Sequence, residues 1–428
     1  MTWSRNAILY PLAGVGAVAS LYAIYALAAA ELTDVLPRKL SSGDDRGAMD
    51  LATTLAANLD APLLEGNRVE LLENGEEIFP PMLEAIEGAR QSINFLTYVY
   101  WQGDIARRFA AELSAACRRG VEVRVLLDAV GSVKMDDALI EEMERAGCRV
   151  ARFRPPRWNE LRRMNGRTHR KVLVVDGTLG FTGGVGIAEE WSGDARDPGQ
   201  WRDDHFRVDG PVVRYLQGAF AENWREATGE VLADERFYPS IEPAGEARAI
   251  PLLGEPGGTV SPIAFLYWIA LQGARERVWI STPYYVPDPD LQEAIEATAR
   301  RGVEIVLIVP GELNDSRVVR WASRTQYRAL LEAGVRIFEF EPTMFHVKAM
   351  TVDLDWAIIG SANFDNRSFE LNYETVLAVE DPALVEALGA SMRRDLERSR
   401  EITREDVAAW SPLERARDHL ALALREQI

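Results

Sequence analysis

The amino-acid sequence predicts an α/β protein built from two related halves, each a mixed β-sheet flanked by helices, with an N-terminal transmembrane helix in front of them. Three observations lead to this prediction. One stretch of sequence recurs with the same order of elements, one charged motif occurs once in each copy, and one long segment near the N-terminus carries no charge. The chain has 428 residues, more than a single domain usually contains, so two units related by a pseudo-twofold are expected.

The N-terminal segment is predicted to cross a membrane. From Ala7 to Ala30 no charged side chain interrupts an apolar run, which is long enough for a membrane-spanning helix of roughly 20 residues. A cleaved signal peptide is the alternative, because small residues close the run, but the apolar part exceeds a signal core of about 7–15 residues. We therefore predict an uncleaved anchor over residues 1–30 and a polar linker over residues 31–62.

The rest of the chain contains an internal repeat. Residues 115–123 and 297–305 both read as the end of a helix, a glycine that stops it, and an apolar strand. We predict a first half over residues 63–235, a second half over residues 236–400 and a helical C-terminal tail over residues 401–428. The tail is assigned a packing role and no chemistry.

Each half is expected to contain a strand, a helix, a strand, a helix and a strand in that order. In the first half these elements are residues 93–99, 104–119, 121–128, 135–146 and 149–153. In the second half they are residues 278–281, 287–301, 303–310, 316–333 and 335–340. Strands that alternate with helices imply a sheet covered on both faces. A site at the interface of two such copies takes residues from both.

The same motif, H-x-K-x4-D, follows the third strand of each half. Because the chain has only four lysines and four histidines, the presence of two of each in one repeated pattern is informative. Side chains at i and i+2 of a strand project from the same face, so each histidine and lysine should point into one pocket. The aspartate lies near the end of the strand. The motif residues are His169, Lys171 and Asp176 in the first half and His346, Lys348 and Asp353 in the second.

These residue types suit the chemistry of a phosphodiester. A neutral imidazole can attack phosphorus and form a phosphohistidine, while a protonated imidazole donates a proton to the leaving oxygen. The ordinary histidine pKa of about 6.5 makes both forms accessible near neutrality. Two lysines supply positive charge to the non-bridging oxygens. The chemistry needs no metal or cofactor, and the sequence shows no carboxylate–histidine cluster with metal-ligand spacing.

The charge balance and the cysteines narrow the function further. A formal net charge of −18 argues against a nucleic-acid partner, because binding a phosphate backbone requires clustered lysine and arginine. The chain has two cysteines, Cys117 and Cys148, so we predict no disulfide framework. Both are expected to be small apolar residues of the core.

From about residue 65 to residue 400 the sequence resembles the phospholipase D superfamily, whose paired H-x-K-x4-D motifs form one site between two halves. The second half keeps the extended pattern, with Gly360-Ser361-Ala362-Asn363 and Asn372-Tyr373-Glu374 after the motif. The resemblance implies that Ser361 and Asn363 help to hold the phosphate and that Glu374 hydrogen-bonds a histidine and fixes its tautomer. It also implies that His169 is the nucleophile and His346 the general acid, an order that the spacing itself does not decide.

The first half departs from this pattern. Glycines stand where the serine and asparagine would be, in the sequence Gly183-Gly184-Val185-Gly186. Backbone N–H groups of a glycine-rich turn can cradle an anion, so Gly184 is kept as a candidate phosphate-binding residue. Asp203 is expected to be the orienting carboxylate of this half, with Asp204 in reserve.

Within the superfamily the chain is most similar to bacterial cardiolipin synthases. The similar segments are residues 167–171, 181–184, 201–203, 210–213 and 283–288. The resemblance implies an enzyme of a bacterial inner membrane that transfers a phosphatidyl group from one phosphatidylglycerol to another and releases glycerol. The alternatives are a phospholipase that hydrolyses the same bond, a nuclease, and a membrane-tethered binding protein with a degenerate site.

Overall fold

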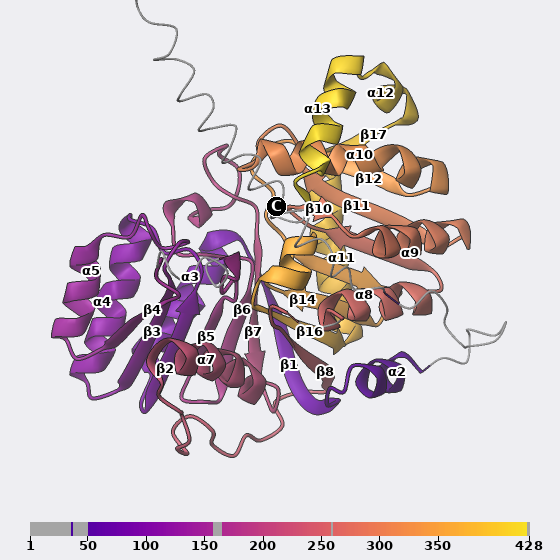
Figure 1. Ribbon diagram of the computed structural model, residues 1–428. Helices are drawn as coiled ribbons and strands as arrows, with labels where there is room; N and C mark the ends of the chain where they lie inside the picture. The colour runs from indigo at the N-terminus through magenta and orange to yellow at the C-terminus, as the bar shows by residue number, and fades with distance from the viewer. Residues whose placement is uncertain (1–35, 37–49, 157–164, 258–259, 426–428) are drawn as a thin grey trace, which may run out of the picture.

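The structure is a computed structural model that describes residues 36, 50–156, 165–257 and 260–425. The predicted anchor over residues 1–30 lies outside the described residues, and so does most of the predicted linker. Within the described part of the chain, every helix is too short or too polar to cross a bilayer. Figure 1 shows two α/β lobes side by side, the first half in indigo to magenta and the second in orange to yellow.

The first half follows a short helix, α2 (Leu51–Asn58). Its elements are β1 (Leu64–Glu73), α3 (Asn74–Gly88), β2 (Ser92–Thr97), α4 (Asp104–Arg118), β3 (Glu122–Asp128), α5 (Asp137–Arg145), β4 (Arg149–Phe153), β5 (Val172–Val175), β6 (Leu179–Gly183), the 3-10 turn η2 (Glu189–Trp191), β7 (Asp204–Asp209) and α7 (Val213–Thr228).

The second half repeats this order and is followed by two C-terminal helices. Its elements are β8 (Ala247–Gly254), α8 (Pro262–Gly273), β9 (Arg277–Ser281), β10 (Tyr285–Val286), α9 (Pro289–Arg300), β11 (Glu304–Pro310), α10 (Arg317–Ala333), β12 (Arg336–Phe340), β13 (Ala349–Val352), β14 (Trp356–Gly360), β15 (Phe364–Asp365), the π-turn η3 (Arg367–Leu371), β16 (Glu374–Glu380), α11 (Pro382–Glu397) and β17 (Ser399–Ile402), then α12 (Arg404–Ala409) and α13 (Pro412–Leu422).

Local sequence sets the ends of the repeated helices. Helix α9 begins where the Asp288 side chain accepts a hydrogen bond from the Leu291 N–H, with Pro289 in the first turn. Helix α10 ends at Gly334, whose φ of 101° is the left-handed conformation that glycine adopts without a steric penalty. The glycine stops read from the sequence therefore mark real helix ends.

One mixed sheet of 15 strands runs through both halves. The strand order is β17-β12-β11-β9-β13-β14-β16-β8-β1-β7-β6-β5-β2-β3-β4. Starting from the central β8–β1 junction, each half places equivalent strands in the same order, and the second half adds β17 at its edge. Toward each edge three strands run parallel, β2–β3–β4 and β9–β11–β12. The edge strand β17 pairs antiparallel with β12, and β13, β14 and β16 also pair antiparallel. The predicted mixed sheet flanked by helices is confirmed, and the two halves share a single continuous sheet.

The core is arranged in layers on both faces of this sheet. Helices α3 and α4 pack against β2 and β3 in one apolar cluster, and α8 and α9 pack against β9 and β11 in another. A third cluster joins the halves, because it contains side chains of α7 and β5 from the first half and of α11 and β14 from the second. The predicted tail starts inside β17, which pairs with β12, so its first residues belong to the sheet.

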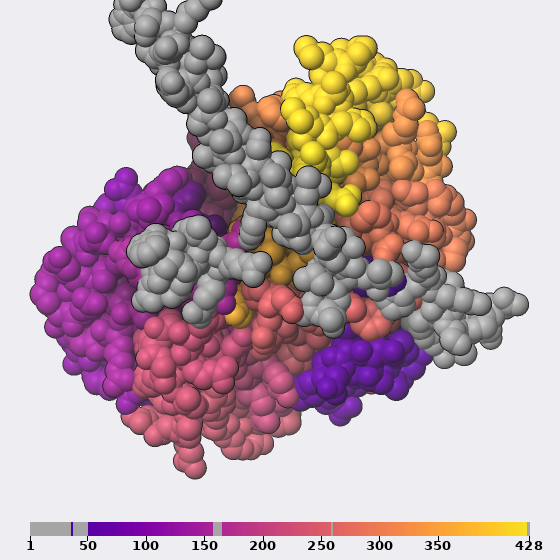
Figure 2. Space-filling model, viewed as in Figure 1, coloured from indigo at the N-terminus to yellow at the C-terminus, as the bar shows by residue number. Residues whose placement is uncertain are grey.

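Helix α2 belongs by its contacts to the second half, although it precedes the first half in the chain. Ala52 and Leu55 of α2 are buried in the apolar cluster of the second half. Figure 2 shows the helix as an indigo patch against the second-half lobe, apart from the purple surface of α4 and α5. Helix α2 therefore packs on the second half before β1 begins the first half.

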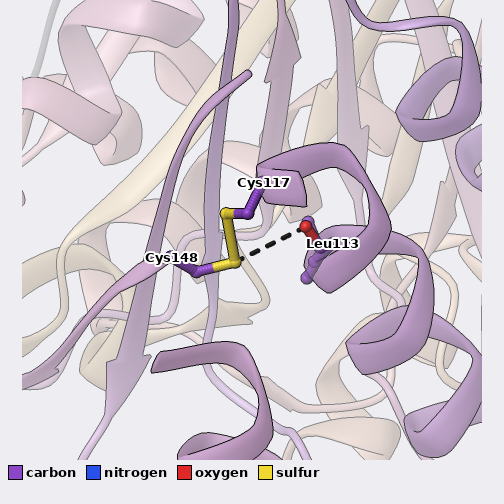
Figure 3. The surroundings of a disulfide bond; sticks show 3 residues. All are labelled: Leu113, Cys117 and Cys148. Carbon is purple, nitrogen blue, oxygen red and sulfur yellow. Dashed lines mark hydrogen bonds between the residues drawn. A yellow bond between two sulfur atoms is a disulfide. The ribbon is translucent and has the colours of Figure 1, made fainter. Parts of the chain in front are cut away.

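The two cysteines correct the sequence prediction. Cys117, at the end of α4, and Cys148, just before β4, form a disulfide with a Cα–Cα distance of 5.8 Å (Figure 3). The Cys148 sulfur also lies 3.5 Å from the carbonyl oxygen of Leu113. The chain passes through β3 and α5 between the two cysteines, and this parallel crossover returns it to the same end of the sheet. Sequence spacing alone did not reveal that proximity.

Candidate active site between the halves

The two histidine–lysine pairs of the repeated motif meet at one cavity between the halves. His169 and Lys171 lie in the extended segment just before β5, and His346 and Lys348 lie in the equivalent segment before β13. The exposure of the four residues is between 3% and 8%. A cavity of about 410 Å³ is lined by His169, Lys171 and His346, together with other residues of both halves. The structure thus brings the two motifs into one site.

Each histidine is oriented by a carboxylate of the other half. His169 Nδ1 lies 2.8 Å from Glu374 Oε1, and His346 Nδ1 lies 2.7 Å from Asp203 Oδ2. The expectation that Asp203 serves the histidine of its own half is therefore wrong. Asp204, the reserve candidate, forms an ion pair with Arg202 instead.

Backbone pairing explains why the carboxylates cross over. The residues before each histidine form a short parallel bridge with the residues before the carboxylate of the other half, Thr168 with Tyr373 and Arg202 with Phe345. The bridging hydrogen bonds run from His169 N to Tyr373 O (2.9 Å), Tyr373 N to Arg167 O (2.8 Å), Arg202 N to Met344 O (2.8 Å) and His346 N to Arg202 O (2.7 Å). The pseudo-twofold is thus visible in individual hydrogen bonds at the site.

The two carboxylates are held by different donors. In the second half, Ser361 Oγ donates a hydrogen bond of 2.5 Å to Glu374 Oε2. In the first half, Trp191 Nε1 donates a hydrogen bond of 2.8 Å to Asp203 Oδ2, the same oxygen that contacts His346. The indole N–H of Trp191 therefore takes the place of the missing serine hydroxyl.

Gly184 is required by the position of Asp203, which corrects its assignment as a phosphate-binding residue. A Cβ atom at Gly184 would lie 2.1 Å from Asp203 Oδ1. The Gly184 N–H donates to the Asp204 carbonyl at 3.0 Å, so it is already used. Ser361 is likewise fully buried behind Glu374 and does not line the cavity. Of the predicted phosphate-binding side chains, Asn363 is the one on the cavity wall.

Aromatic rings surround both imidazoles, and the sequence analysis did not select them as site residues. The Tyr98 ring meets His169 edge-on with 5.2 Å between centroids. Trp191 and Trp201 lie 5.4 Å and 5.3 Å from the His346 ring. A glycine at the serine position was the available signal for Trp191, because the carboxylate then needs another donor.

The two lysine side chains fold back toward the histidines. Lys171 Nζ donates to the His169 carbonyl at 2.8 Å, and Lys348 Nζ donates to the His346 carbonyl at 2.7 Å. Burial lowers the pKa of Lys348 to about 8, so this lysine is largely cationic at neutral pH. Burial, and then the charge of Lys348, lower the pKa of Lys171 well below its ordinary value. A bound anion would raise both pKa values and draw positive charge to the site.

The same burial leaves both histidines neutral in the free protein. The pKa of His169 is lowered to about 4, because burial and the charge of the lysines outweigh Glu374. Burial, followed by Lys348, also lowers the pKa of His346 against the opposing effect of Asp203. With Nδ1–H donated to a carboxylate, each neutral ring keeps the lone pair of Nε2 available.

Both orienting carboxylates are ionised. Burial raises the pKa of each, but the nearby imidazole and lysine outweigh it, so the pKa of Asp203 and the pKa of Glu374 are lower than ordinary values. The buried site therefore contains two ionised carboxylates beside two lysines whose pKa values are lowered.

The motif aspartates are positioning residues of the fold, which corrects their grouping with the catalytic residues. The Asp176 carboxylate accepts hydrogen bonds from the N–H groups of residues 90–92. The Asp353 carboxylate does the same for residues 275–277. Neither lines the cavity, because a strand separates each aspartate from its histidine. They fix the start of β2 and of β9, the neighbours of the motif strands in the sheet.

The fold and site define a two-lobed α/β protein of the phospholipase D type, with one candidate active site at the interface of its halves. A family model described as "Cardiolipin synthase, PLD-like domain" matches residues 82–192 and 267–396. The chain therefore belongs to the PLD-like domain family of cardiolipin synthases, and the predicted family is confirmed.

Individual relatives agree with this assignment. The chain is 33% identical to a probable cardiolipin synthase, YwiE, of Bacillus subtilis over 79% of this chain and 67% of that protein. It is 34% identical to cardiolipin synthase A of Pseudomonas putida over 81% of this chain and 72% of that protein. The match to the cardiolipin synthase of Geobacillus kaustophilus, at 37% identity, covers 63% of that protein, so the chain spans about two thirds of the length of these relatives.

A solved structure shows the same fold. The phosphatidylserine synthase of Haemophilus influenzae superimposes with a TM-score of 0.65 at 14% identity, over 88% of this chain and all of that chain. At this identity the likeness concerns the fold alone.

Asp353→Ala is predicted to destabilise the fold while leaving the cavity wall intact. The substitution removes a carboxylate that accepts hydrogen bonds from three backbone N–H groups, so the free energy of unfolding should fall by about 3 kcal/mol. Asp355→Ala on the same turn is the matched control and should change it by less than about 0.5 kcal/mol. Denaturant unfolding measures both, and equal effects would contradict the assigned role.

Trp191→Phe is predicted to lower kcat about tenfold with little change in KM. A tenfold fall in kcat corresponds to about 1.4 kcal/mol, the contribution of one lost hydrogen bond. The phenyl ring keeps the packing, but Asp203 loses a donor and holds His346 less firmly. Trp224→Phe is the control, because Trp224 is also buried and donates to a carboxylate, that of Glu230, at 2.8 Å. Steady-state kinetics of both variants decide the point, and an equal loss in the control would refute a positioning role for Trp191.

Proposed function

We propose that this protein is a phosphatidyltransferase that makes cardiolipin from phosphatidylglycerol through a covalent phosphohistidine. The observation that carries the proposal is the pair of crossed histidine–carboxylate contacts around one cavity, His169 with Glu374 and His346 with Asp203. Two buried lysines accompany them. The names of the relatives support the choice of lipid substrate and product.

In the first step, Nε2 of His169 attacks the phosphorus of phosphatidylglycerol. The bond from phosphorus to the glycerol oxygen breaks, and His346 donates a proton to that oxygen, so glycerol leaves. Glu374 keeps the Nδ1–H of His169 in place, which stabilises the positive charge that develops on the ring. Lys171 and Lys348 stabilise the negative charge on the non-bridging oxygens.

In the second step, His346 is neutral and acts as the base. It removes the proton from a hydroxyl of a second phosphatidylglycerol, whose oxygen attacks the phosphohistidine and releases His169. Cardiolipin forms, and the proton that His346 takes from the hydroxyl balances the one it gave to glycerol. The negative charge of a bound phosphodiester raises the pKa of His346, so the proton needed for the first step is acquired with the substrate.

The lipid substrate and the apolar N-terminal segment support a location at a bacterial inner membrane. The proposed anchor over residues 1–30 holds the catalytic halves beside the bilayer that contains substrate and product. The net charge of −18 counts against the nuclease alternative. Hydrolysis uses the same residues with water as the acceptor, so product analysis separates it from transfer.

The test of the function uses the full chain with phosphatidylglycerol vesicles labelled in the phosphatidyl group. We expect labelled cardiolipin and an equal amount of free glycerol. Phosphatidic acid as the main product would instead establish hydrolysis, and the absence of any product would refute the enzyme assignment.

Covalent labelling tests the role of each histidine in the same preparation. After quenching at alkaline pH, label should remain on the wild-type protein and be absent from His169→Ala, because that variant lacks the nucleophile. Label that persists in His169→Ala and disappears in His346→Ala would reverse the two roles.

The pH dependence of kcat/KM should reflect the lowered pKa of His169. The imidazole attacks only when it is neutral, so activity falls as the pH drops through its pKa of about 4. We therefore expect the acid limb of the profile at about pH 4, well below the ordinary histidine value of about 6.5. Samples returned to pH 7 before assay control for irreversible unfolding. An acid limb at about 6.5 would contradict the buried, neutral state of His169.

A further inference from the structure

The two walls of the cavity differ in chemistry. The first half contributes mostly aromatic and apolar side chains, and the second half contributes mostly polar ones. Besides the motif residues, the first-half wall consists of Tyr98, Val99, Trp101, Trp191 and Trp201. The second-half wall consists of Tyr284, Asp315, Ser316, Val319, Asn363, Asp365, Arg367 and Asn372. The pseudo-twofold of the fold is therefore broken where a substrate would lie.

Two acceptors on the polar wall have no partner. The side-chain oxygens of Asn363 and Asn372 are buried, and within the described residues neither accepts a hydrogen bond. The two residues are only 4% and 6% exposed. The side chain of Asn363 hydrogen-bonds to Asp365, which occupies one of its two amide N–H groups, and its oxygen has no partner within the described residues. An unpaired buried acceptor carries a free-energy cost that a ligand with a donor group removes.

Two carboxylates extend this set of acceptors. Asp365 is buried and accepts a hydrogen bond of 2.7 Å from the Ser368 N–H. Burial raises the pKa of Asp365 to about 7. Asp315 lies nearer the surface and accepts a hydrogen bond of 2.5 Å from the Tyr284 hydroxyl. The polar wall is thus rich in hydrogen-bond acceptors.

Acceptors do not bind a phosphodiester, whose oxygens only accept. In the proposed mechanism the lysines and imidazoles of the motifs contact the phosphate, so these acceptor oxygens are available to another part of the substrate that donates hydrogen bonds. Hydroxyl groups are such donors.

At the matching positions the first half lacks the acceptors of Asn363, Asp365 and Asn372. Counted from the glycine that ends β6 or β14, Gly186 corresponds to Asn363 and Ala188 to Asp365. Counted back from the orienting carboxylate, Trp201 corresponds to Asn372. The acceptors are therefore a property of one wall and not of the repeated fold.

We propose that Asn363, Asn372, Asp365 and Asp315 form a subsite that binds the hydroxyl groups of a neutral polyol, the leaving or accepting alcohol of the transfer. This inference rests on the proposed function and specifies its alcohol subsite. A held hydroxyl competes with water for the phosphohistidine, so the subsite favours transfer over hydrolysis.

The experiment compares alcohols of different hydroxyl content as acceptors. The full chain is incubated in phosphatidylglycerol micelles with labelled glycerol, with ethanol or with ethanolamine, and the corresponding phosphatidyl products are measured. For Asn372→Ala we expect the ratio of transfer to glycerol over transfer to ethanol to fall about fivefold to tenfold, the effect of one or two lost hydrogen bonds. Ethanol has one hydroxyl, which must occupy the reacting position, so phosphatidyl transfer to ethanol should change much less.

Two matched controls accompany the variants. Asn366→Ala removes a neighbouring buried asparagine whose oxygen is also unpartnered within the described chain, but which does not line the cavity. Asp315→Ala, at an exposed position on the cavity wall, should lower the same ratio. Glu312→Ala, in the same loop but away from the cavity wall, should not.

The outcomes separate the subsite from the function itself. A selective loss of glycerol transfer in Asn372→Ala and Asp315→Ala, with normal ratios in both controls, supports the subsite. Equal loss with glycerol and ethanol, or a wild-type preference for ethanolamine over glycerol, overturns it. A wild-type protein that transfers to no acceptor refutes the proposed function instead.

Discussion

The structure depends on the two contacts that cross between the halves, His169 with Glu374 and His346 with Asp203. Each half provides an imidazole but not the carboxylate that orients it. The contacts form because each histidine segment pairs with the backbone that leads to the other half's carboxylate. That pairing needs one continuous sheet through the β1–β8 junction, so neither half has a complete site by itself.

The charge balance of the site follows from the same constraint. Two lysines and two carboxylates are buried together, which is tolerable because each charge has an opposite charge nearby. Burial makes both imidazoles neutral in the free protein. In the proposed mechanism the negative charge of the substrate raises the pKa of His346, which gains the proton needed for the first step.

The two halves hold their orienting carboxylates with different hydrogen-bond donors. The second half holds a long Glu374 with the Ser361 hydroxyl, and the first half holds a shorter Asp203 with the Trp191 indole. A side chain at Gly184 would collide with Asp203, so the glycine and the tryptophan belong together. The indole also packs on His346, which makes this wall aromatic and leaves the hydrogen-bond acceptors to the other half.

The sequence by itself determined the duplicated α/β fold, the four motif residues and the family, because repeated spacing and strand periodicity are local properties of the chain. Only the tertiary structure decided which carboxylate serves which histidine, since that depends on pairing between segments far apart in the chain. The same holds for Cys117 with Cys148 and for the backbone role of Asp176 and Asp353. Trp191 became a site residue only because the fold places its indole beside Asp203, a distance that no local pattern encodes.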